Sequence, residues 1–185
     1  MRTCARLGLL LVVVGAILVG SAETVAAPGL TRRVSVDSSG GQGDGLSEYP
    51  AISTDGHYVS FDSAAANLVA GDTNGRYDIF VHDRQTGFTE RVSISSSGAQ
   101  GVNDSVSPAI NSDGRYVAFQ SFADNLVSGD TALCGPPPGY SCPDIFVRDR
   151  QTSTTERVSL SSAEVEANGE SWSPAISGDG RYVAF

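Results

Sequence analysis

Residues 107–119 have the sequence SPAINSDGRYVAF, and two close copies of this stretch occur elsewhere in the chain. The copies are YPAISTDGHYVSF at 49–61 and SPAISGDGRYVAF at 173–185. Pro50, Pro108 and Pro174 give repeat spacings of 58 and 66 residues. An Arg-Val-Ser triplet precedes each copy, and its valine always lies 16 residues before the proline. Self-similarity at such a period predicts a repeat architecture, in which one supersecondary unit stacks on copies of itself.

Each unit contains segments that we expect to form four strands. In the second unit these segments are residues 108–111, 116–120, 144–148 and 156–160. Asp113-Gly114 joins the first two, and an Asp-Gly pair between apolar runs is a strong hairpin signal. The second and third segments are apolar on both faces, which predicts burial, whereas serines alternate through the fourth and predict one wet face. The pattern predicts an all-β fold, a β-propeller of four-stranded antiparallel blades.

These motifs also carry a family resemblance. The repeated Pro-Ala-Ile-Ser-x-Asp-Gly-Arg-Tyr-Val-Ala-Phe, the later Asp-Ile-Phe-Val-x-Asp-Arg-x-Thr and the Arg-Val-Ser triplet resemble the TolB-type, WD-like β-propeller repeats of bacterial exported proteins. The resemblance covers about residues 31–185. It looks closest to a subgroup of secreted, mostly uncharacterised proteins with an Asn-Leu-Val-x-Gly-Asp-Thr-Asn-Gly connection. It implies a closed ring of about six to eight blades. TolB's own partners do not transfer, because a unit of 58 residues is longer than in TolB.

The repeats predict how the chain is divided. We expect an outer strand at 31–36, blade one at 49–95, blade two at 107–161 and a half blade at 173–185. Two and a half blades leave an apolar flank and a strand edge uncovered. We therefore expect a fragment of a longer protein. The remaining blades would come from the full-length chain or from other subunits, and we prefer the first source to self-assembly.

The N-terminus predicts export. Arg2 and Arg6 precede a stretch of 13 small and apolar residues at 7–19. A membrane-spanning helix needs about 20 such residues, so a signal peptide at 1–26 is favoured over an anchor. Cleavage is expected after Ala22 or Ala26, and it would leave a chain without a membrane span. The predicted location is the periplasm, the cell surface or the extracellular space.

Two cysteines, Cys134 and Cys142, lie close together in an insert that lengthens the second unit. In an exported chain this spacing predicts a local disulfide. Free thiols in a loop are the alternative, and a metal site is disfavoured because no histidine or further cysteine is near. The net charge is −9 and all twelve basic residues are arginine, which argues against a nucleic acid partner.

The sequence offers little sign of catalysis. It has no Gly-x-Ser-x-Gly motif, and both His57 and His82 occupy repeat positions that hold arginine in other units. We expect both histidines to be exposed and predict no enzymatic role for this chain. Asp72, Asn74 and Asp78 place three oxygen ligands within seven residues and make calcium a candidate ligand. The competing interpretation is a turn in which the aspartates cap backbone amides.

The preferred functional prediction is a non-catalytic exported module that binds a protein, a glycan or a small ligand. Two alternatives stay open, since a propeller fold does not define a function. The chain could be the propeller domain of an exported hydrolase, such as a peptidase, whose catalytic domain lies beyond residue 185. It could also be a structural module of the cell surface.

Overall fold

The repeated Asp-Gly hairpin is the local unit from which the fold is built. In its first copy the backbone N–H of Ser53 donates to the Tyr58 carbonyl oxygen (2.9 Å). Asp55 Oδ1 accepts hydrogen bonds from Ser53 Oγ (2.6 Å) and from the His57 backbone N–H (3.0 Å). Gly56 has a φ of +72°, which glycine adopts without strain. The second and third copies repeat this turn at Asp113-Gly114 and Asp179-Gly180.

The first four-stranded sheet forms blade one. Its strands pair in chain order, each antiparallel to the next. They are β1 (Ser47–Ile52), β2 (Tyr58–Ser63), β3 (Asp78–Asp83) and β4 (Thr89–Arg91). The order β1-β2-β3-β4 is an antiparallel meander, the strand order of a propeller blade.

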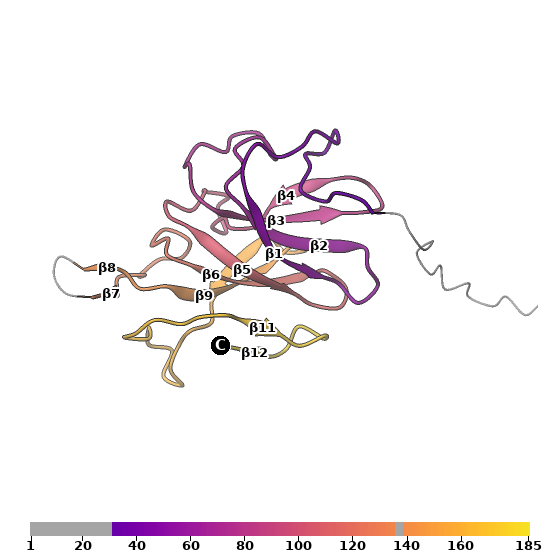
Figure 1. Cartoon of the computed structure of the whole chain (residues 1–185). Coiled ribbons are helices and arrows are strands. Elements are labelled where there is room, and N and C mark those ends of the chain that lie inside the picture. The colour runs from indigo at the N-terminus through magenta and orange to yellow at the C-terminus, as the bar shows by residue number, and fades with distance from the viewer. Residues whose placement is uncertain (1–30, 136–138) are drawn as a thin grey trace, which may run out of the picture. The chain divides into compact units, whose positions relative to one another are not determined.

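The second sheet has the same layout and forms blade two. Its strands are β5 (Ser105–Ile110), β6 (Tyr116–Ser121), β9 (Asp144–Asp149) and β10 (Thr154–Arg157). The two short strands β7 (Leu133–Cys134) and β8 (Tyr140–Ser141) pair only with each other, in the insert between β6 and β9. A third hairpin, β11 (Ala175–Ile176) and β12 (Val183–Ala184), follows blade two. Blade one, blade two and the β11–β12 hairpin succeed one another in chain order (Figure 1). The fold is therefore all-β, an incomplete propeller.

The middle strands of each blade are buried, as the apolar pattern predicts. In β2 and β6 only the first residue is partly exposed. Phe61 stacks on Phe80 within blade one, and Phe119 stacks on Phe146 within blade two, each with ring centroids 5.9 Å apart. A larger core joins the blades, because Ile79 and Val81 of β3 belong to one cluster with residues of blade two.

The observed strands differ from the predicted segments at several places. β5 spans Ser105–Ile110 rather than 108–111. β10 spans Thr154–Arg157 rather than 156–160, because the chain turns after Val158, whose N–H still donates to Ile145 O (2.8 Å). Beyond it Leu160 forms an isolated bridge to Glu166. The region 31–36, where we expected an outer strand, contributes one isolated bridge, from Val36 to Gln42.

A bulge interrupts the first strand of each complete blade. The pairing register shifts between Glu48 and Ala51 in β1, and between Val106 and Ala109 in β5. The residue before the proline has a positive φ at Tyr49 (+44°), Ser107 (+55°) and Ser173 (+53°). These residues and the prolines after them line one hollow of about 270 Å³. The three units therefore converge where a propeller has its central channel.

The computed structural model describes residues 31–135 and 139–185. All strands belong to one compact unit, Arg33–Phe185. The predicted signal peptide at 1–26 lies outside the described residues. Within the described part, no helix is long and apolar enough to cross a membrane.

Candidate binding groove

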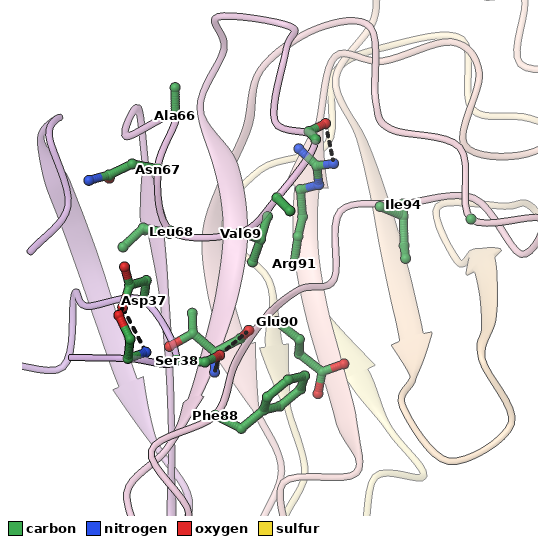
Figure 2. A pocket seen from close by; sticks show the side chains of 15 residues that line it. Asp37, Ser38, Ala66, Asn67, Leu68, Val69, Phe88, Glu90, Arg91 and Ile94 are labelled. Atoms are coloured by element: carbon green, nitrogen blue, oxygen red, sulfur yellow. Dashed lines mark hydrogen bonds between the residues drawn. The ribbon is translucent and has the colours of Figure 1, made fainter. Parts of the chain in front are cut away.

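A surface groove of about 830 Å³ runs along the outer part of blade one. Most of its lining comes from three segments: residues 37–39, the connection 66–71 that follows β2, and residues 88–91 at β4. Ile94 and Gly98 complete it. Figure 2 shows Phe88 and Glu90 together at one end of the groove, with Arg91 and Ile94 farther along it. Leu68 and Val69 come from the repeated Asn-Leu-Val motif and connect the groove to a core cluster of blade one.

Internal hydrogen bonds fix the polar wall of the groove. Asp37 Oδ1 accepts bonds from the backbone N–H groups of Ser39 (2.7 Å) and Gly41 (2.8 Å) and from the Ser39 hydroxyl (2.6 Å). These bonds, the one from the Ser39 hydroxyl foremost, hold the pKa of Asp37 below its usual value. The Thr89 hydroxyl donates to Val36 O (2.6 Å), and the Thr89 N–H donates to Ser38 Oγ (3.0 Å). The segment 36–39 is thereby fastened to the edge of blade one.

Blade two has a smaller groove at the equivalent place, of about 570 Å³. Its wall is fastened in the same way, since the Thr155 hydroxyl donates to Ile94 O (2.5 Å) and the Thr155 N–H to Ser96 Oγ (2.9 Å). The main chemical difference is Phe88, which blade two replaces with Thr154. Phe88 is 55 % exposed. The repeat does not need an aromatic side chain there, so Phe88 is a feature of the blade-one groove alone.

The predicted calcium ligands lie near this groove and surround an arginine. Arg91 Nη1 is 3.2 Å from Asp72 Oδ1 and 3.2 Å from Asp78 Oδ2. Asn74 Nδ2 donates to Asp78 Oδ2 (3.0 Å), while Asn74 Oδ1 accepts from the Arg76 N–H (2.9 Å). The guanidinium thus supplies the positive charge between the two carboxylates. Calcium binding by Asp72, Asn74 and Asp78 stays a prediction, and calorimetric titration with calcium tests it.

Blade two contains the counterpart of this cluster with one more carboxylate. Arg157 Nη1 contacts Asp130 Oδ1 (3.2 Å), Asp144 Oδ2 (3.4 Å) and Glu166 Oε1 (2.6 Å). Burial raises the pKa of Asp130 to about 7, against the opposing effect of Arg157. Glu166 occupies the position that Gln100 has in the preceding repeat, and we did not single it out from the sequence. The sequence does contain a feature that indicates Glu166, because the third unit has Glu-Val-Glu-Ala where the others have Gly-x-Gln-Gly.

The prediction that the histidines are exposed is wrong for His82, which is only 7 % exposed. Its Nδ1 lies 2.9 Å from the Thr89 hydroxyl. That hydroxyl already donates to Val36 O, so it accepts from His82 Nδ1–H. In blade two Arg148 is equally buried and donates to the equivalent Thr155 hydroxyl (3.1 Å). Histidine and arginine exchange at this position because both supply a buried donor. Burial also lowers the pKa of His82.

The two cysteines that we predicted to form a disulfide lie in the insert of blade two. A disulfide joins Cys134 of β7 to Cys142, which directly follows β8. The exposed side chains of Leu133 and Tyr140 belong to the same small hairpin. The disulfide therefore closes an excursion from the blade and leaves the four strands of blade two in the same order as those of blade one.

No protein-family model matches the chain, and no curated protein matches it. Among solved structures, the chain is similar to a putative TolB from Agrobacterium tumefaciens. That match has 19 % identity and a TM-score of 0.41, and it covers 75 % of this chain and 42 % of that one.

Two structures from Pyrococcus species are also similar. One is the β-propeller domain of the Trilobed protease from Pyrococcus furiosus, with 17 % identity and a TM-score of 0.43 over 75 % of this chain and 32 % of that chain. The other is the Pyrococcus horikoshii acylaminoacyl peptidase, with 18 % identity and a TM-score of 0.43 over 75 % of this chain and 16 % of that chain. This chain spans less than half the length of each of the three structures. The assignment of the fold rests on the strand order and pairing described above.

Proposed function

We propose that the chain is a non-catalytic, exported β-propeller module that binds an apolar segment of a partner protein in the blade-one groove. The observation that carries this proposal is the exposed Phe88 ring beside a groove of about 830 Å³. Aromatic side chains that are not needed for packing and lie next to a pocket are typical centres of binding energy at interfaces.

The repeat itself supports a binding role for Phe88. Blade two folds with threonine at the equivalent position, so the aromatic ring contributes nothing that the blade architecture requires. The groove wall beside it is held by the bonds from Thr89 to Val36 and Ser38. A prearranged wall lowers the ordering cost that a binding site would otherwise have on association.

The charge of the chain indicates which partner segments fit best. The net charge is −9, and several of the twelve arginines are already paired with carboxylates. An acidic surface favours encounter with positively charged partners. We therefore propose a partner segment that combines apolar side chains with lysine or arginine.

Selection of peptides from a random library tests the binding role. The affinity of peptides selected on the full chain is then measured by isothermal titration calorimetry for wild type, Phe88→Thr and Val102→Thr. Val102→Thr is the control, because Val102 is as exposed as Phe88 but lies outside the groove. Loss of an aromatic interface centre costs roughly 2 kcal/mol or more, so Phe88→Thr should weaken binding by about 30-fold or more. Peptides that bind Phe88→Thr as tightly as wild type would contradict the proposal.

The export part of the proposal is supported by the Cys134–Cys142 disulfide, because such bonds persist mainly in oxidising compartments. Expression of the full chain in a bacterium, with and without residues 1–26, tests it. With these residues present, the protein should be found outside the cytoplasm, and both cysteines should resist maleimide labelling. Recovery from the cytoplasm with Cys134 and Cys142 both reactive would be the opposite result.

A further inference from the structure

The two arginine clusters differ in one hydrogen-bond donor. In the blade-one cluster Gln100 Nε2 donates to Asp72 Oδ1 (3.2 Å). In the blade-two cluster Asp130 has the repeat position of Asp72, and Glu166 has that of Gln100. An ionised glutamate only accepts hydrogen bonds, so it cannot supply the donor that glutamine supplies. Two acceptors therefore face each other in blade two unless one of them carries a proton.

The carboxyl groups of the blade-two cluster are close together and shielded from water. One oxygen from each of Asp130, Asp144 and Glu166 lies within 4.8 Å of the other two. The side chains of Asp130 and Asp144 are only 4 % and 1 % exposed. The equivalent side chains in blade one, Asp72 and Asp78, are 3 % and 0 % exposed, so this burial is a property of the repeat. Water screens charges poorly in such a place, which makes two ionised carboxylates in contact unfavourable.

The partners of each carboxyl group indicate which one holds the proton. Burial raises the pKa of Asp144, but the Ser159 hydroxyl and the Arg157 guanidinium both donate to its ionised form. Burial acts in the same direction on Glu166, yet two backbone N–H groups hold its pKa below the usual value. For Asp130 burial prevails over the charge of Arg157. The proton therefore belongs on Asp130, whose O–H donates to the Glu166 carboxylate.

Glu166 also holds the start of the insert, just before β7. Its Oε1 accepts from the Ala132 N–H (3.0 Å) and from the Thr131 N–H (3.2 Å). The carbonyl of Ala132 in turn accepts from the N–H of Cys142 (3.1 Å), the second cysteine of the disulfide. Both sides of the disulfide-closed insert thus meet at Ala132. Glu166 is the side chain that fastens this base of the insert to the turn at 161–166.

We propose that Asp130 and Glu166 share one proton, and that loss of this proton detaches Glu166 from the base of the insert. Glu166 is the group that leaves, because its side chain is 15 % exposed and the turn before it, residues 161–165, is exposed. Asp130 stays in place because it is buried in the blade. In blade one the Gln100 amide is a permanent donor, so the corresponding contact there has no such dependence on pH.

The direction of the pH effect follows from where the proton binds. The attached state holds the proton more tightly than the detached state, so detachment becomes more favourable as the pH rises. The increase is tenfold for each pH unit, until Asp130 is ionised in the attached state too, at a pKa of about 7. The insert is therefore held most firmly in acid and most loosely from about pH 7 upward. This effect is independent of the blade-one groove and of its ligand.

Amide hydrogen exchange at Ala132, measured by NMR on the full chain, tests the proposal. A chelator is present, so that no metal ion takes the place of the proton, and each rate is divided by that of an unstructured peptide at the same pH. Protection of Ala132 in wild type should fall by about tenfold or more between about pH 5 and about pH 8. Glu166→Gln restores the donor found in blade one and should give equal protection at both pH values. Glu164→Gln is the control and should behave like wild type, because Glu164 lies in the same exposed turn but outside the carboxyl cluster.

A second variant covers the case in which Glu166→Gln does not fold, as judged by circular dichroism. Asp130→Asn also places a permanent amide donor between the two side chains, and it should likewise remove the pH dependence. The amide of Phe119 in the buried strand β6 reports unfolding of the whole blade. Three results would each overturn the proposal: equal protection of Ala132 at both pH values in wild type, a wild-type loss of protection in Glu166→Gln or Asp130→Asn, or protection of Ala132 at about pH 8 as high as that of Phe119.

Discussion

Substitution of Gly114 by alanine tests whether the contact between Gly114 and Tyr58 determines how the blades pack. The change has two costs. Gly114 has a φ of +74°, and a residue with a Cβ in this conformation costs roughly 1–2 kcal/mol. The new Cβ would also overlap the Tyr58 ring, and overpacking of this kind costs about 1–3 kcal/mol. Together they should lower the free energy of unfolding by roughly 2–5 kcal/mol.

Gly56 provides a matched control within the same chain. It occupies the same turn with a φ of +72°, but the nearest atom to an added Cβ is Arg84 Nη1 at 3.4 Å. Gly56→Ala should therefore show only the backbone cost of roughly 1–2 kcal/mol.

Urea unfolding followed by circular dichroism measures the difference between the two variants. Gly114→Ala should unfold at a lower urea concentration than Gly56→Ala. In thermal unfolding its Tm should be lower by roughly 2–12 °C for a domain of this size. Adding Tyr58→Ala should remove most of that difference, since the overlap is then gone. Equal losses for Gly56→Ala and Gly114→Ala would refute the idea that the ring contact matters.

Two further predictions concern the arginine clusters. Asp130 has a raised pKa of about 7, against roughly 3.9 in an unfolded chain, so the folded chain binds more protons between these values. The free energy of unfolding should consequently fall as the pH rises from about 4 to 7. Asp130→Asn should make this decrease with pH less steep. Equal slopes for wild type and Asp130→Asn would contradict the prediction. Arg91→Met leaves Asp72 and Asp78 facing each other without their cation and should cost about 3–5 kcal/mol in urea unfolding. A loss below about 1 kcal/mol, as for an exposed pair, would show that Arg91 does not balance these carboxylates.

The parts of the fold that sequence could predict are those determined locally. The Asp-Gly turns define each hairpin through bonds among residues only a few positions apart, such as those of Ser53 and Asp55. The burial of β2 and β3 follows from continuous apolar runs. Both signals are contained within a single unit; the Asp-Gly turn occurs in three units, and the apolar run of the third strand occurs in two.

What sequence could not predict depends on contacts between distant segments. The burial of His82 depends on Thr89 and on Val36, which lies 46 residues away along the chain. The partners of Asp72 and Asp78 include Arg91, which comes from another strand. A count of oxygen ligands along the chain suggested calcium but could not show that the Arg91 guanidinium lies beside two of them, and calcium binding stays a prediction.

The bulges at the prolines also limit how the blades can associate. β1 and β5 are the edge strands that face the axis, and an edge strand can normally accept a further strand from another molecule. Pro50 and Pro108 have no N–H to offer, and the left-handed residues Tyr49 and Ser107 break the extended backbone beside them. Pairing of a strand from another molecule with β1 or β5 is therefore disfavoured. An exposed array of these repeats is thereby protected against amyloid-like growth at this edge.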